Sequence, residues 1–165
     1  MQIVLDARQR IHGVPPALAI DQKAGSVLGR LYLAGKLSES LDKAEARRES
    51  DALYEAGEKF RKDWDTAMRF IQPPKGLNRI DAGSDMDWDS EHFDRDKYTR
   101  LAIAATGNHQ TAKARLSADE WVAVEAVVLF DSEPLTVYGL GPLRSGLMAL
   151  AKGYGMIGKA DRVPA

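Results

Sequence analysis

Five polar side chains in the last third of the sequence are of the types that contact DNA. They are Arg144, Ser145, Lys152, Lys113 and Arg115. Arginine reads guanine edges in the major groove, and lysine, arginine and serine side chains hold phosphate oxygens. Arg144 lies near the start of a predicted helix, where recognition helices usually contact bases. These five residues are therefore the candidate DNA contacts.

The segment from Ser117 to Tyr154 resembles a helix-turn-helix. Ser117 and Glu120 have the spacing of a capping box that begins one helix, and the helical pattern breaks around Pro134. After the turn Gly139-Leu140-Gly141-Pro142 comes a second apolar stripe, formed by Leu143, Leu147, Leu150, Ala151 and Tyr154. Two helices packed in a bundle have the same periodicity, so that interpretation stays open.

Acidic side chains are concentrated in residues 81–97 and suggest cation binding. Asp85, Asp87 and Asp89 have the spacing of the first three ligands of a calcium loop. Ser90 stands where that loop has glycine, and Asp96 stands where it has glutamate. The preferred interpretation is a solvated acidic linker, so no metal site is predicted. The same run would also suit docking on a basic partner such as RNA polymerase.

The sequence has no arrangement typical of an enzyme active site. His12, His92 and His109 are isolated and lack the spacing of a helical zinc site, which favours surface or loop positions for them. The Gly139-Leu140-Gly141 stretch lacks the third glycine and the preceding strand of a dinucleotide loop. We therefore expect a protein that is not an enzyme and needs no cofactor.

The candidate contacts are expected to be positioned by helices, because the sequence shows helical periodicity and lacks strand alternation and internal repeats. Helices are predicted from Lys23 to Leu33, from Glu39 to Ile71, from Asp94 to Ala105, and on both sides of Pro134. The strongest apolar stripe, on the second of these, is Leu53, Ala56, Phe60, Trp64, Ala67, Met68 and Ile71. On the same helix Lys59, Arg61 and Lys62 are expected to pair with neighbouring carboxylates.

The ends of the predicted helices are given by turn and capping residues. Gly35 should end the first helix and Ser38 should cap the next. The first half of that next helix has little but alanine to bury, so we expect it to be exposed, frayed or interrupted, with a break near Ser50. The following helix should stop at Gly107-Asn108. The predicted fold class is all-α, multi-helix, with a C-terminal unit like a helix-turn-helix.

Proline and glycine punctuation divides the chain into four predicted parts. Residues 1–72 form a helical hairpin and a long helix, with a short helix between Met1 and Ile11. Residues 73–93 form the acidic linker or loop, residues 94–156 form the helix-turn-helix-like unit, and residues 157–165 form a tail. Gly25, Ser26 and Gly29 allow close helix packing, or a subunit contact in a homodimer.

Composition limits the class of protein. The sequence contains no cysteine, which excludes disulfides and thiolate metal sites and fits the cytoplasm. No apolar run is long enough to span a membrane, and the first residues lack the order of a signal peptide. The formal net charge of -1 means that a DNA-binding face would have to gather basic groups on one side.

Three stretches together resemble a known family. They are residues 56–64, residues 125–129 and residues 143–155. They are similar to a helix-turn-helix-associated domain of unassigned function, which occurs in alphaproteobacterial regulators, among them activators of gene-transfer agents, and in prophage genes. The resemblance covers roughly residues 51–156 and implies DNA binding by fold analogy, without supplying a catalytic residue.

The expected function is therefore that of a bacterial, phage or prophage DNA-binding transcriptional regulator that uses a C-terminal recognition helix. Its partner is double-stranded DNA, and dimerisation would join two half-sites. One alternative is a non-enzymatic module that binds RNA polymerase or another host protein through the acidic segment. Another is a small-terminase-like DNA-packaging component.

Overall fold

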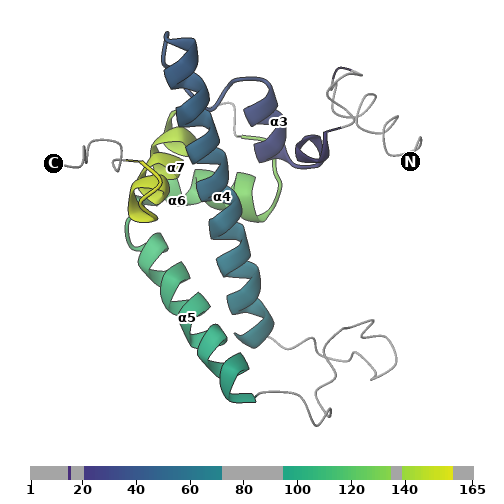
Figure 1. Ribbon diagram of the computed structural model, residues 1–165, viewed down its shortest axis with the longest axis vertical. Coiled ribbons are helices and arrows are strands. Elements are labelled where there is room, and N and C mark those ends of the chain that lie inside the picture. Colours follow the sequence, from purple (N-terminus) through teal and green to yellow (C-terminus); the bar gives the residue numbers. More distant parts are fainter. Residues whose placement is uncertain (1–14, 16–20, 72–94, 135–138, 158–165) are drawn as a thin grey trace, which may run out of the picture.

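The computed structural model describes residue 15 and residues 21–71, 95–134 and 139–157. Within these ranges the protein is all-α and has no strand, which confirms the predicted fold class. The elements are η1 (Gln22–Gly25), α3 (Val27–Leu33), α4 (Lys43–Ile71), α5 (Arg95–Lys113), α6 (Ala118–Val124), η2 (Glu125–Leu129) and α7 (Gly141–Gly153) (Figure 1).

Several expectations fall outside the described residues. They are the helix between Met1 and Ile11, the acidic segment 73–93 with the calcium-like spacing that extends to Asp96, His12, His92, and the tail after Ile157.

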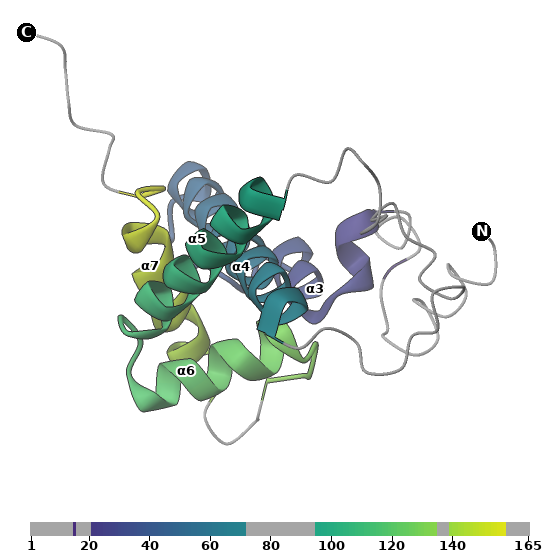
Figure 2. The same cartoon turned by 90° about the horizontal axis from the view of Figure 1, so that it is seen from below.

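The long helix α4 is the axis of the molecule, and it contacts α3, α5, η2 and α7. In Figure 1, α5 runs beside the lower half of α4, and α6 and α7 lie beside its middle and upper parts. Figure 2 shows α7, α6 and α3 placed around α4 when the molecule is seen from below.

A single apolar cluster joins these helices. It contains Val27, Leu28, Leu31, Leu37, Leu53, Ala56, Phe60, Ala112, Val124, Val127, Val128, Leu143, Leu147, Leu150 and Ala151. The ring of Phe60 is fully buried, and its centroid lies 5.0 Å from that of His109 and 6.1 Å from that of Trp121. Residues from both sides of the segment 73–93 therefore share one core.

The helix α4 is continuous from Lys43 to Ile71, so the break expected near Ser50 is wrong. The residues from Lys43 to Arg48 are mostly exposed, as expected. Ser50 is buried and lies on the same face as Leu53, because residues three apart in a helix are neighbours. The cap is also different from the prediction, since Asp42 Oδ1 accepts the backbone N–H groups of Ala44 and Glu45 at 2.7 and 2.9 Å. Ser38 instead donates its hydroxyl to Glu49.

The apolar stripe of α4 is largely confirmed. Leu53, Ala56, Phe60 and Ala67 are buried, and Trp64 and Met68 are half-buried.

The helix α5 continues through Gly107 to Lys113, so the stop predicted at Gly107-Asn108 is wrong. Ala105, His109 and Ala112 are all buried, and their spacing of four and three places them on one face. Burying that face offsets the cost of a helical glycine, which is about 1 kcal/mol.

The predicted helix from Lys23 to Leu33 is two elements, because Ser26 interrupts it and caps α3. The Ser26 hydroxyl accepts the Gly29 N–H at 3.0 Å. A Cβ at Gly29 would come 1.8 Å from the Lys23 carbonyl oxygen, so only glycine lets η1 fold back on α3. Gly35, with φ of 66°, ends α3 as predicted.

The chain that leaves η2 is fastened to α3 and α4. Asp131, with φ of 51°, accepts the Val27 N–H at 2.7 Å and so caps the start of α3. Arg61 donates from Nε to the Val128 carbonyl at 2.6 Å, and its Nη2 lies 3.9 Å from the Asp131 carboxylate. These bonds fix where the connection to α7 begins.

Candidate nucleic-acid interface

The helix α7 carries three of the five candidate contacts, and its packing decides which of them solvent can reach. Its apolar stripe, Leu143, Leu147, Leu150 and Ala151, is buried as predicted. Pro142 lies in the first turn, and Gly155, with φ of 69°, closes the end in a Schellman motif. Ser145 and Lys152 are exposed, and their spacing of seven places them on one face of the helix.

Three candidate contacts lie where α5 ends beside the end of α7, and we call Lys113, Arg115 and Lys152 the basic surface. All three residues are exposed. The Arg115 guanidinium lies directly over Gly153, since a Cβ there would come 1.8 Å from Nη1. The Lys113 ammonium lies 4.1 Å from the centroid of the Trp121 ring. Both cations are held by uncharged groups, so their positive charge is not cancelled.

Tyr154 connects the basic surface to α4. The Lys59 ammonium lies 4.9 Å from the centroid of its ring, and its hydroxyl donates to Asp63 at 3.4 Å. Burial, together with the charge of Asp63, raises the pKa of the Tyr154 hydroxyl, which therefore stays protonated at neutral pH. Lys59 also lies 3.9 Å from the Asp63 carboxylate, so this neighbouring cation is partly neutralised.

Arg144, the candidate base contact, is not a freely exposed residue. Its side chain is only 24% exposed. Its Nε donates to the Lys36 carbonyl at 2.8 Å, and its Nη1 is paired with the Glu39 carboxylate. The start of α7 is therefore tied to the segment between α3 and α4.

Ser145 is exposed but also has an intramolecular partner. It donates its hydroxyl to Glu120, whose carboxylate also accepts the Ser117 N–H at 2.8 Å in the predicted capping box. The bonds from Ser145 and from Ser117 lower the pKa of Glu120. A carboxylate thus stands beside Ser145, which disfavours a phosphate at that position.

The connection between the two predicted halves of the helix-turn-helix is long. It covers residues 130–140, between the end of η2 and the start of α7. A typical helix-turn-helix has a turn of about three or four residues. The short turn of this region lies instead between α5 and α6, at residues 114–117. The helix-turn-helix character of residues 94–156 therefore stays a prediction.

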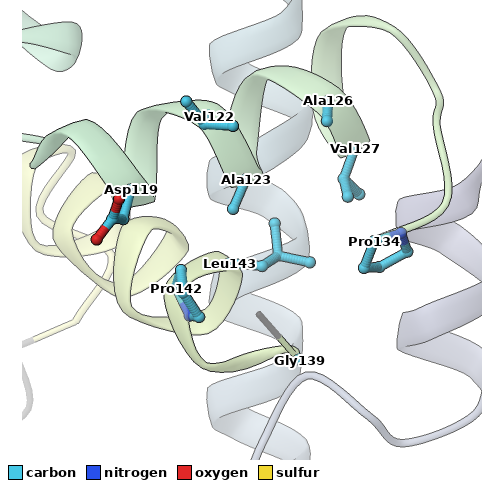
Figure 3. Close-up of a pocket in the computed structure, with 9 residues that line it drawn as sticks. All are labelled: Asp119, Val122, Ala123, Ala126, Val127, Pro134, Gly139, Pro142 and Leu143. Atoms are coloured by element: carbon cyan, nitrogen blue, oxygen red, sulfur yellow. The ribbon is translucent and has the colours of Figure 1, made fainter. Parts of the chain in front are cut away.

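An apolar cavity of about 100 Å³ lies between α6 and the first turn of α7. Figure 3 shows Val122, Ala123, Ala126 and Val127 along one wall and Pro142 and Leu143 along the other. Asp119 is the one charged residue among the described lining residues. The cavity suits a small apolar group, and Val122 at its rim is 50% exposed.

His109 is buried in α5, so its predicted surface or loop position is wrong. It stacks on Phe60 with an angle of 28° between the rings, and its Nδ1 has no hydrogen-bond partner among the described residues. Burial, with the nearby charge of Lys113, lowers the pKa of His109. A neutral imidazole is therefore part of the core beneath the basic surface.

Within the described residues, no group of three or more histidine and acidic side chains is placed to hold a metal ion. None of the helices described there has both the length and the apolar character needed to cross a membrane.

Several residues that shape this site lie far from the candidate contacts in sequence. The partners of Arg144 lie more than 100 residues upstream, and no local spacing could reveal them. The missing side chain of Gly153 is what admits Arg115, and no local spacing indicates this either. Comparisons with protein-family models, curated proteins and solved structures find no match to this chain.

Proposed function

We propose that the protein is a DNA-binding transcriptional regulator that meets double-stranded DNA with the basic surface and the exposed face of α7. The observation that carries the proposal is the position of the exposed Arg115 over Gly153, which brings the end of α5, with Lys113, to the last turn of α7, with Lys152. Phosphate contacts of this kind supply most of the affinity of DNA-binding proteins. A net charge of -1 is compatible with it, because only the local field matters at the contact.

The five candidate contacts take different roles in this proposal. Lys113, Arg115 and Lys152 hold phosphates. Arg115 is well suited to this, because Gly153 lets its guanidinium lie close to the α7 backbone. Ser145 and Arg144 lie further along α7 and are engaged by carboxylates in the free protein.

The test is binding to a pool of random duplex DNA at two salt concentrations. One variant replaces Lys113, Arg115 and Lys152 by glutamine. The matched control replaces Lys43, Arg47 and Arg48, three exposed cations in the first turns of α4. Both variants lose the same charge. Three phosphate contacts correspond to a decrease of about 2.7 in the slope of log affinity against log salt.

The expected result is that the first variant loses affinity and salt dependence while the control keeps both. Enrichment of one sequence from the pool by the unaltered protein would give the operator. Failure of the unaltered protein to bind at low salt, or an equal loss in both variants, would overturn the proposal.

A second candidate function, protein binding, is favoured by the apolar cavity beside the exposed Val122. An apolar patch with this shape accepts an apolar side chain from a partner. If DNA binding fails, Val122→Asp should abolish capture of the partner protein. The mass in solution separates both candidates from a ring-forming packaging component.

A further inference from the structure

The guanidinium of Arg144 is held by two groups of different stiffness. The Lys36 carbonyl is fixed, because Gly35 and Lys36 close α3 in a Schellman motif with bonds of 2.9 Å to Tyr32 and Leu31. The Glu39 carboxylate is on a side chain that is 74% exposed. Only the second of these partners can leave without disturbing a helix end.

We propose that Glu39 withholds Arg144 from DNA in the free protein, and that a DNA phosphate replaces the Glu39 carboxylate when the complex forms. The inference rests on the proposed function, because Arg144 lies in α7, the helix that also carries Lys152. A carboxylate and a phosphate offer the same kind of charged oxygen acceptors to a guanidinium. The exchange keeps the half-buried guanidinium of Arg144 paired with a negatively charged group.

The surroundings of the pair allow this exchange. Arg144 lies in the first turn of α7, and Lys152 lies in the last turn of the same helix. A groove of about 290 Å³, with Leu37, Leu53 and Met148 among its lining residues, lies beside Arg144 and Glu39. Glu39 therefore has room to turn away while the Lys36 carbonyl still holds the arginine Nε. The remaining N–H groups of the guanidinium then reach a phosphate.

The experiment compares Glu39→Ala with Glu45→Ala, alone and in an Arg144→Gln background. Glu45 lies in the first turn of α4 and accepts a hydrogen bond from Ser40 at 2.9 Å, so its loss removes the same charge without freeing Arg144. DNA affinity is measured over a range of salt concentrations, and thermal unfolding confirms that each variant is folded.

We expect Glu39→Ala to bind DNA about two- to fivefold more tightly than Glu45→Ala, the range set by an exposed ion pair. The salt slope should be the same for both variants, because the contact between Arg144 and a phosphate forms in both complexes. In the Arg144→Gln background the gain in affinity should vanish, and the slope should decrease by about 0.9, the value for one lost phosphate contact.

Each other outcome decides against the inference. Equal gains from the two alanine variants would show a general charge effect, and a gain that survives Arg144→Gln would show that Arg144 is not the residue released. In both cases the basic surface would still carry DNA binding. Absence of DNA binding by the unaltered protein would overturn this inference and the proposed function together.

Discussion

The two ends of α7 hold their cations in opposite ways. At the C-terminal end, Arg115 lies over Gly153 and Lys113 lies over the Trp121 ring. At the N-terminal end, Arg144 is paired with Glu39, and Ser145 is bonded to Glu120. Glycine and aromatic rings position a cation without cancelling its charge. A carboxylate positions the cation and also neutralises its charge. Exposure alone therefore does not identify the cations that are available to a polyanion.

The largest expected effect is on stability, and it comes from a substitution in the core that weakens the packing of both ends of α7. Leu147 is fully buried between them. Leu147→Ala should lower the free energy of unfolding by about 2–5 kcal/mol, the usual cost of such a cavity. Chemical denaturation measures it. The exposed Leu41, changed to alanine, is the control and should leave stability unchanged.

Acidification should lower the stability of the folded protein through His109, which is buried beneath the basic surface at the C-terminal end of α7. Burial first, and then Lys113, lowers the pKa of His109, while Asp63 acts in the opposite direction. As the pH falls through about 6.5, the value for an unperturbed histidine, the unfolded chain takes up the proton before the folded protein does. Stability should therefore fall with pH from that point downward.

Denaturation of the unaltered protein and of His109→Gln between pH 8 and about pH 5 tests this. The variant should lack the part of the pH dependence due to this residue. Parallel curves for the two proteins would contradict the assignment.

Adding one methyl group at the C-terminal end of α7, and one at its N-terminal end as a control, tests how each end holds its cation. In Gly153→Ala, the new Cβ would occupy the position of Arg115 Nη1, so the guanidinium must move and one phosphate contact is lost. The salt slope of DNA binding should decrease by about 0.9. Gly141→Ala is the matched control, because a Cβ there meets nothing within 4 Å. An equal change in both variants would count against the placement of Arg115.

The smallest expected effect concerns the N-terminal end. Arg144→Gln should change the free energy of unfolding by only about 0–1 kcal/mol, since its charged partner Glu39 is 74% exposed. Denaturation at low and high salt measures this. A loss well above that range would mean that Arg144 is needed to hold the segment between α3 and α4.

Local patterns predicted those parts of the fold that depend on neighbouring residues. The capping box at Ser117, the stop at Gly35 and the buried stripe of α7 all involve partners within a few positions. The predicted breaks at Ser50 and Gly107 were wrong, because the burial of each helix face outweighs local propensity there.

The candidate site was predicted as a set of residue types but not as a surface. Three of its cations are exposed at one junction, whereas Arg144 is engaged by a residue 105 positions upstream. The burial of His109 likewise depends on the Phe60 ring, which comes from another helix. Single-sequence spacing contains no information on such pairs.

The bond from Asp131 to the start of α3 has a consequence for how this protein can be divided. Residues that follow α6 complete the cap of a helix near the beginning of the chain, and Arg61 of α4 bridges the two. A C-terminal fragment cut at residue 94 would lose these partners, together with the α4 side of the core. The residues after position 94 are thus not a unit that could be transferred to another protein with its properties intact.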